Sequence, residues 1–138
     1  MSSQLEVMVL DDEATVGKRL TQALSKIGCH VETFIDPAAA LDRINEKDFD
    51  IVITDVVMKG ITGVQVLEHV MRRSPRTKVI VISAYAMMSL ARDAMERGAF
   101  DFVAKPFHVE DLRRVVLRAA EALELTSSEG HSEPTRTE

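Results

Sequence analysis

The sequence predicts an α/β fold in which five parallel strands form a doubly wound sheet with helices on both faces. Three observations predict it. Five short apolar runs alternate with five segments of helical periodicity, which implies parallel strands joined by right-handed crossovers. Three of the runs are nearly continuous in Val, Ile, Leu and Met, as in strands that are covered on both faces. The length of 138 residues suits a single domain.

The five apolar runs are the predicted strands. In chain order they are Leu5–Leu10, His30–Phe34, Asp50–Asp55, Lys78–Ala84 and Phe100–Lys105. The first, third and fourth are the continuous runs. The second and fifth alternate more between apolar and polar residues, so we expect them nearer the edges of the sheet.

The first two predicted helices have clear boundary signals. Glu13–Gly28 has an apolar face, and Gly28 ends it as a glycine after a last helical turn does. Asp36–Asp48 opens with Asp36 as the N-cap and Pro37 at the first helical position. The apolar face of the first helix comprises Val16, Leu20, Ala23, Leu24 and Ile27.

Three more helices follow the third, fourth and fifth strands. The third begins at Thr62 or Gly63 and ends before Pro75, because a residue that precedes proline disfavours the helical conformation. The fourth is Met87–Gly98, and the fifth is Val109–Leu125. Apolar residues of the fifth recur at helical spacing at Leu112, Val115, Val116, Ala119 and Leu123.

These boundaries place one domain at residues 5–125. Residues 126–138 are polar and without periodicity, so we expect a disordered tail there. Five strand–helix units are too few for an eight-stranded barrel. The predicted fold is therefore flavodoxin-like, (βα)5, with strand order 2-1-3-4-5.

The composition argues against several classes of protein. A net charge of -5 disfavours direct nucleic-acid binding, which needs a basic patch. The single cysteine, Cys29, cannot form an intrachain disulfide, which fits a reducing compartment. The first residues do not resemble a signal peptide, and the longest apolar run, Val79–Met88, is too short to span a bilayer. We expect a cytoplasmic protein that does not bind membranes.

Polar side chains follow four of the five predicted strands. Asp11 and Asp12 follow the first strand, Asp55 ends the third, Ser83 lies at the end of the fourth, and Lys105 ends the fifth. In an open α/β sheet, ligands bind at the carboxyl ends of the strands, near the point where the strand order reverses. We therefore expect three acids, a hydroxyl and a lysine at one edge of the sheet.

This set of side chains predicts a magnesium-dependent phosphoryl-transfer site. Three neighbouring carboxylates repel one another, and a divalent cation removes the conflict. Oxygen ligands with room for water suit Mg²⁺. Lys105 can pair with Asp55 or with a phosphoryl oxygen, to which Ser83 can donate a hydrogen bond. An aspartate carboxylate is a competent phosphoryl acceptor.

The motifs that carry these residues resemble those of the receiver domain of bacterial two-component response regulators. They are "LDDE" after the first strand, "ITDVVM" at the third, "VISAY" at the fourth and "AKPF" at the fifth. The resemblance extends from about Leu5 to Leu125. It implies a phosphoacceptor signalling domain that catalyses only its own phosphorylation and dephosphorylation. Its phosphoryl donor would be a sensor histidine kinase or a phosphotransfer protein.

The resemblance also implies roles for the acidic residues. Asp55 would be the phosphorylated aspartate. Asp12 and Asp55 would ligate Mg²⁺ directly, Asp11 would act largely through a bound water, and the backbone carbonyl of Val57 would be another metal ligand. Val57 and Tyr85 occupy positions that influence attack by water on the acyl phosphate. Neither carries an amide or a carboxylate, so we expect a long-lived phosphoryl group.

The remaining implied roles concern the switch. Ser83 and Lys105 would each bind a phosphoryl oxygen, and the peptide bond between Lys105 and Pro106 would be cis. Phe102 would be the switch aromatic, turning inward as Ser83 moves toward the phosphate. The fourth helix, fifth strand and fifth helix would then present a changed surface to a downstream partner, an output domain or a second copy of the chain.

One alternative stays open on the residues alone. A Mg²⁺-dependent phosphohydrolase can also use an aspartate nucleophile at the end of a strand. Repeated turnover of a small phosphate ester would distinguish it from a domain that is labelled once. The sequence also leaves open whether the chain is a stand-alone regulator or the amino-terminal part of a longer one.

Overall fold

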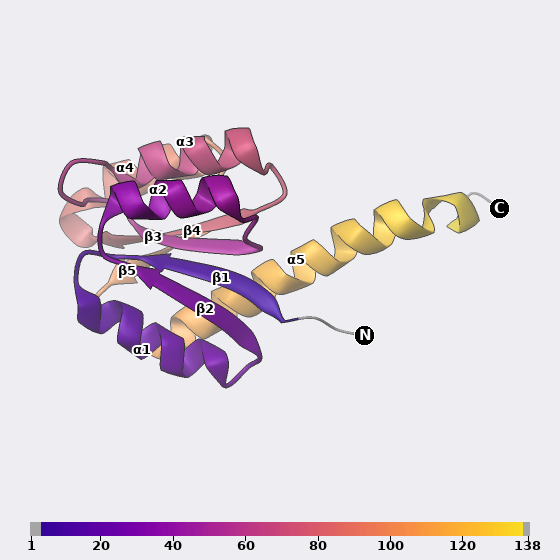
Figure 1. The fold of residues 1–138 in the computed structure, drawn as a ribbon, viewed down its shortest axis with the longest axis horizontal. Coiled ribbons are helices and arrows are strands. Elements are labelled where there is room, and N and C mark those ends of the chain that lie inside the picture. The colour runs from indigo at the N-terminus through magenta and orange to yellow at the C-terminus, as the bar shows by residue number, and fades with distance from the viewer. Residues whose placement is uncertain (1–3, 137–138) are drawn as a thin grey trace.

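The computed structural model describes residues 4–136, with side chains described up to residue 124. Strands and helices alternate along the chain (Figure 1). The strands are β1 (Leu5–Leu10), β2 (Cys29–Phe34), β3 (Ile51–Asp55), β4 (Lys78–Ala84) and β5 (Asp101–Lys105). The helices are α1 (Ala14–Ser25), α2 (Pro37–Glu46), α3 (Gly63–Arg73), α4 (Met88–Glu96) and α5 (Val109–Arg136), and a short 3-10 helix, η1 (Tyr85–Met87), precedes α4.

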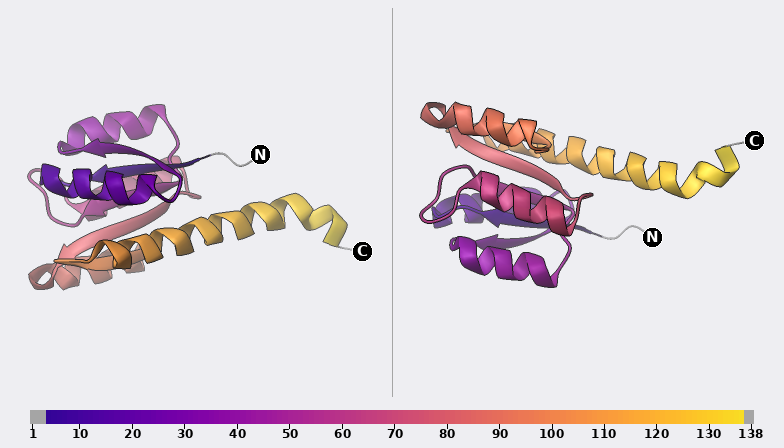
Figure 2. Two further views of the ribbon diagram at one scale, coloured as in Figure 1. Left: turned by 90° about the horizontal axis from the view of Figure 1, so that it is seen from below. Right: turned by 90° about the horizontal axis from the view of Figure 1, so that it is seen from above.

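The strands form one parallel sheet in the order β2-β1-β3-β4-β5. This confirms the predicted fold class and strand order. Helices α1 and α5 cover one face of the sheet, and α2, α3 and α4 cover the other (Figures 1 and 2). Because each helix returns the chain across the sheet, all five strands end at the same edge.

The continuous apolar runs are explained by burial on both faces. In β1, Val7 and Val9 pack into the core under α1 and α5, whereas Met8 and Leu10 pack into the core under α2, α3 and α4. All four are at most 1% exposed. Side chains alternate between the faces of a strand, so a strand between two helical layers needs apolar residues at every position.

The edge strands were also predicted correctly. β2 and β5 lie at the two ends of the sheet, and most of their residues are half-buried or exposed. Their mixed apolar and polar sequences match this partial cover.

Local signals set the starts of two helices. Asp36 caps α2 by accepting a hydrogen bond from the backbone N–H of Ala38, as predicted. Helix α3 begins at Gly63, because Thr62 and Gln65 form a reciprocal capping box. Helix α4 begins one residue later than predicted, after η1.

Helix α5 continues to Arg136 and extends beyond the sheet (Figure 2). It thus includes much of the segment 126–138, for which the composition predicts disorder; residues 137 and 138 lie outside the described part. The expected disorder stays a prediction, which amide hydrogen exchange would measure. No helix within residues 4–136 combines the length and the apolar character needed to cross a membrane.

Candidate functional site

The carboxyl ends of β1 and β3 bring three acidic side chains together. Asp11 and Asp12 directly follow β1, and Asp55 is the last residue of β3. β1 and β3 are paired in parallel up to Leu10 and Thr54, so Asp11 and Asp55 continue neighbouring strands at the same level. One carboxylate oxygen of each acid lies within 4.8 Å of those of the other two. The predicted convergence of the three acids is confirmed.

Lys105, the last residue of β5, extends its ammonium group into this acidic cluster. Its Nζ donates to Asp11 Oδ2 at 3.1 Å, to Asp55 Oδ2 at 3.0 Å and to Glu13 Oε1 at 2.8 Å. The peptide bond between Lys105 and Pro106 is cis, as the sequence resemblance implies. The lysine therefore links the ends of β1, β3 and β5.

Asp11 is the most deeply buried acid of the cluster. Its side chain has no exposed surface, whereas Asp12 is exposed. Asp11 Oδ1 accepts the backbone N–H of Glu13 at 2.8 Å, while Oδ2 accepts from Lys105. Both oxygens of Asp11 therefore already have protein donors, and Asp12 presents its carboxylate to solvent.

Burial and charge shift the pKa values of this cluster in different directions. Burial raises the pKa of Asp11, against the lowering effect of the hydrogen bonds from Glu13 and Lys105. Burial by itself would lower the pKa of Lys105, but its hydrogen bonds to Glu13, Asp55 and Asp11 outweigh burial and raise it. Lys105 in turn lowers the pKa of Glu13. Lys105 therefore stays protonated at neutral pH.

The donor set of this cluster fits a hard divalent cation. Three carboxylates lie within ligand distance of one another, and among residues 4–124 their ion pairs all come from a single ammonium, that of Lys105. Carboxylate oxygens with one solvent-exposed member leave room for water, which is the coordination that Mg²⁺ prefers. Asp11, Asp12 and Asp55 are thus consistent with a metal site.

A comparison with protein families decides the identity of this arrangement. Residues 7–117 match the family model described as the response regulator receiver domain. The chain belongs to this family. The receiver domain is a phosphoacceptor signalling module of two-component systems, so the acidic cluster with its lysine is typical of a phosphoacceptor site.

Similar proteins include regulators much longer than this receiver domain. A putative NtrX-like response regulator from Rickettsia typhi is 34% identical over 125 residues, which cover 89% of this chain and 26% of that protein. The DNA-binding transcriptional regulator NtrC of Escherichia coli K12 is 32% identical over 113 residues, 82% of this chain and 24% of that protein. The chain spans about a quarter of the length of these relatives.

A solved structure of similar size has the same fold. The receiver domain protein from Clostridium thermocellum superposes with a TM-score of 0.83 at 27% identity. The match covers 88% of this chain and 98% of that one. The similarity thus covers nearly the whole of the Clostridium thermocellum receiver domain protein.

Asp55 is held by its own loop as well as by Lys105. Its Oδ1 accepts the backbone N–H of Val57 at 3.3 Å, and its backbone carbonyl accepts the hydroxyl of Thr54 at 3.0 Å. Gly63, the first residue of α3, packs closely against this carbonyl, and its N–H donates to the carbonyl of Val56 at 2.7 Å. The start of α3 therefore supports the backbone of the candidate phosphoacceptor.

We expect Gly63→Ala to destabilise the receiver domain by about 3 kcal/mol and to slow the labelling of Asp55. A Cβ at residue 63 would lie 2.5 Å from the Asp55 carbonyl oxygen and 2.9 Å from Val56 Cα, and both are backbone atoms. Urea unfolding measures the change. Gly60→Ala is the control, because its Cβ would meet open space at a φ of +92° and should cost only about 1 kcal/mol. Equal effects of the two variants would contradict the packing argument.

The other predicted site residues lie on β4, on β5 and in the loop after β3. Ser83 is fully buried near the end of β4, and its hydroxyl donates to the carbonyl of Ala84 at 3.0 Å. Phe102 is half-buried in β5 and packs against the core on the α2–α4 side. Val57 forms an isolated antiparallel bridge with Thr62 in the loop after β3. The roles proposed for Ser83, Phe102 and the Val57 carbonyl remain predictions.

Glu13 is a member of this site that the sequence analysis missed. It is the last letter of the "LDDE" motif and the first residue of the predicted helix Glu13–Gly28. Its side chain makes no capping bond to α1 and instead makes the shortest of the three contacts to Lys105. The signal in the sequence that could have predicted this role is the acidic residue directly after Asp11 and Asp12.

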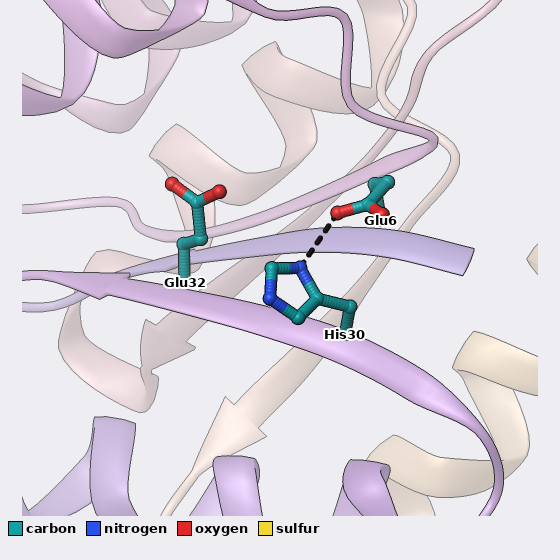
Figure 3. A group of neighbouring side chains, drawn as sticks. All are labelled: Glu6, His30 and Glu32. Atoms are coloured by element: carbon teal, nitrogen blue, oxygen red, sulfur yellow. Dashed lines mark hydrogen bonds and ion pairs between the residues drawn. The ribbon is translucent and has the colours of Figure 1, made fainter. Parts of the chain in front are cut away.

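A second group of titratable side chains lies on β1 and β2. Glu6 Oε1 contacts His30 Nδ1 at 2.8 Å, and Glu32 lies nearby (Figure 3). Their spacing could hold a metal, but the carboxylates already have cationic partners from α2 and the residue that follows it. Arg43 donates to both oxygens of Glu32, and Lys47 bridges Glu32 and Glu6. We interpret these ion pairs as structural contacts that hold α2 against the edge of the sheet.

We expect Glu32→Gln to destabilise the domain by about 1 kcal/mol at neutral pH. Arg43 lowers the pKa of Glu32 from 4.5 to about 2. Because the folded-state pKa lies below the unfolded value, the contribution is complete above about pH 4.5 and is lost as the pH falls through about 2. Thermal unfolding at several pH values measures it. Glu46→Gln, a more exposed partner of Arg43, should have a smaller effect, and a loss that is independent of pH would refute the assignment.

Proposed function

We propose that this receiver domain accepts a phosphoryl group on Asp55 from a histidine of a sensor histidine kinase or phosphotransfer protein. The observation that carries the proposal is the position of Asp55. Its carboxylate ends β3, contacts the Lys105 ammonium at 3.0 Å and lies within 4.8 Å of oxygens from two further acids. A carboxylate beside a cation and a candidate metal site is suited to accept a phosphoryl group.

Mg²⁺ is the proposed cofactor. Asp12 and Asp55 would ligate it directly, the backbone carbonyl of Val57 would add a ligand, and Asp11 would act through water. The two protein donors that Asp11 already has support this indirect role. When bound, Mg²⁺ neutralises negative charge that develops on the phosphoryl oxygens.

The protein's own residues perform the transfer as follows. A lone pair of an Asp55 carboxylate oxygen attacks phosphorus, a P–O bond forms, and the P–N bond to the donor histidine breaks. The bonding electron pair returns to the imidazole, and the product is an acyl phosphate. Lys105, whose raised pKa keeps it protonated, binds a phosphoryl oxygen, and Ser83 donates its hydroxyl to another.

The signal would be read at the surface formed by α4, β5 and α5. Phosphorylation adds charge that new bonds to Ser83 and Lys105 recognise, and Phe102 turns inward as Ser83 moves. An open groove on this surface is lined by Tyr85, Phe102 and Arg114 among others. Exposed apolar residues of η1, α4 and α5 are Tyr85, Met87, Met95 and Leu117. Such a surface suits a downstream partner, an output domain or a phosphorylation-dependent homodimer.

The proposed localisation of the domain follows from its proposed kinase partner. We place the domain in the cytoplasm, where sensor kinases present their phosphorylated histidines, with no direct contact to nucleic acid or membrane. The similar NtrC protein is a DNA-binding transcriptional regulator, but the chain matches only 24% of its length. An output function would therefore come from a partner or from a further domain.

We expect the phosphoryl group on Asp55 to be long-lived. The substitutions Val57→Asn and Tyr85→Glu should shorten its lifetime. Both residues are exposed, 43% for Val57 and 80% for Tyr85. Neither side chain carries an amide or a carboxylate that could orient a water. An amide or a carboxylate there should speed dephosphorylation by at least about tenfold. The measurement is the decay of labelled protein after removal of the donor. Unchanged decay in both single variants and in the double variant would refute the idea.

Incubation with a small phosphodonor and Mg²⁺, followed by mass spectrometry, tests the proposal. We expect one phosphoryl group per chain, mapped to Asp55, and none without Mg²⁺. A label on another residue would overturn the assignment. Repeated turnover of a small phosphate ester without accumulation of label would favour the alternative, a Mg²⁺-dependent phosphohydrolase.

A further inference from the structure

The ammonium group of Lys105 has a carboxylate partner for each of its hydrogens. An ammonium group has three N–H donors. Lys105 has three carboxylate acceptors within hydrogen-bond distance, from Asp11, Glu13 and Asp55. A phosphoryl oxygen on Asp55 therefore finds no free donor on Lys105. One of the existing contacts has to be given up.

The three acceptors differ in how easily they can release the lysine. The Asp11 side chain has no exposed surface, so the loss of its cation would leave a buried charge unpaired. Asp55 is the residue that carries the phosphoryl group. The side chain of Glu13 is 63% exposed, so water can replace Lys105 as its partner. Glu13 is therefore the acceptor that is least costly to displace.

The local structure shows that the Glu13 side chain is committed to Lys105 and not to its own helix. Glu13 occupies the N-cap position of α1, where a side chain normally accepts a backbone N–H of the first turn, but it makes no such bond. Its backbone N–H is fixed by Asp11 Oδ1 at 2.8 Å. Glu13 and Lys105 also line the same open pocket, so the released carboxylate would face solvent.

We propose that Glu13 is a positioning residue that holds Lys105 in the unphosphorylated state and competes with the incoming phosphoryl oxygen for it. This inference rests on the proposed function of Asp55. The Glu13 carboxylate occupies the N–H donor of Lys105 that the phosphoryl group needs. This contact must therefore break before Lys105 can bind the phosphoryl oxygen. Removal of this competitor makes a phosphoryl mimic bind more tightly.

Two variants distinguish the effect of the Glu13–Lys105 contact from the effect of the negative charge of Glu13. Glu13→Gln removes the charge and weakens the contact. Glu13→Asp keeps the charge but is shorter by one methylene, so we expect it to lose the 2.8 Å contact to Lys105. Glu121→Gln, on the exposed side of α5, is the matched control. The probe is beryllofluoride, which mimics a phosphoryl group on an aspartate, titrated at saturating Mg²⁺ by calorimetry.

Competition by contact predicts that both Glu13 variants bind beryllofluoride about two- to fivefold more tightly than the wild type and the control. Tighter binding by Glu13→Gln alone would show a general charge effect and overturn the proposal. Equal or weaker binding by both variants would also overturn it. Absence of beryllofluoride binding in the wild type would overturn the proposed function, and with it this inference.

A second readout follows the lysine itself. Exchange of the Lys105 ammonium hydrogens with water, measured by ¹⁵N NMR, should be faster in both Glu13 variants than in the wild type without ligand. With beryllofluoride bound, the wild type and the variants should exchange at the same rate, because Glu13 has then released the lysine. A difference that persists in the bound state would contradict the displacement of Glu13.

Discussion

Asp55→Asn should abolish phosphorylation of this receiver domain completely while leaving the fold intact. Asparagine has the size of aspartate, and its side-chain oxygen can still accept the N–H of Val57 or the ammonium of Lys105. What it loses is the anionic nucleophile, and an amide oxygen does not form a stable acyl phosphate. Removal of one charge from the acidic cluster also relieves repulsion, so we expect no loss of stability.

The measurement is intact-mass spectrometry after incubation with a small phosphodonor and Mg²⁺. The wild type should carry one label that hydroxylamine removes, as an acyl phosphate requires. Asp12→Asn is an informative control, because it removes a proposed metal ligand but keeps the acceptor. It should label more slowly, at Asp55. Undiminished label on Asp55→Asn would show that another residue is the acceptor.

Lys105→Ala should have the second largest effect, and it should act on stability and on transfer together. The substitution leaves the fully buried Asp11 carboxylate and the Asp55 carboxylate, of which 12% is exposed, without a cation between them. Breaking a buried ion pair leaves an unpaired charge, and here we expect a loss of about 2–3 kcal/mol without Mg²⁺. The loss of a donor to the phosphoryl oxygen should slow transfer by about a hundredfold.

Magnesium provides the check on this prediction. Since the metal would supply the missing positive charge, Mg²⁺ should raise the unfolding midpoint of Lys105→Ala more than that of the wild type. Lys18→Ala, which removes an exposed lysine of α1, should behave as the wild type. A normal transfer rate in Lys105→Ala, or an equal response to Mg²⁺, would contradict the role assigned to Lys105.

The strands and helix starts were predictable because their signals are local. A run such as Leu5–Leu10 has apolar residues at every position because both faces of β1 are buried, and that demand is visible in the sequence itself. Asp36 and Pro37 mark the start of α2 through a bond to a residue two positions away. Parallel strands end at one edge, so the convergence of Asp11, Asp55 and Lys105 followed from the fold class.

Contacts between side chains far apart in the sequence were not predictable in the same way. Glu13 and Lys105 are separated by 92 residues, and Lys47 and Glu6 by 41. Whether Glu13 caps its helix or contacts the lysine depends on where β5 ends relative to β1. The 3-10 helix η1 was not predicted, and its last residue, Met87, is the first residue of the predicted helix Met87–Gly98.

The fold class, the placement of the acids and the lysine at strand ends, and the resemblance to receiver domains could all be recognised in the amino-acid sequence. Those features depend on residue type and spacing along the chain. The folded chain was needed to see which carboxylates share the Lys105 ammonium, that the Ser83 hydroxyl bonds to Ala84, and that Arg43 neutralises Glu32. A side chain forms hydrogen bonds with groups that folding brings close to it, and spacing along the chain does not specify which groups those are.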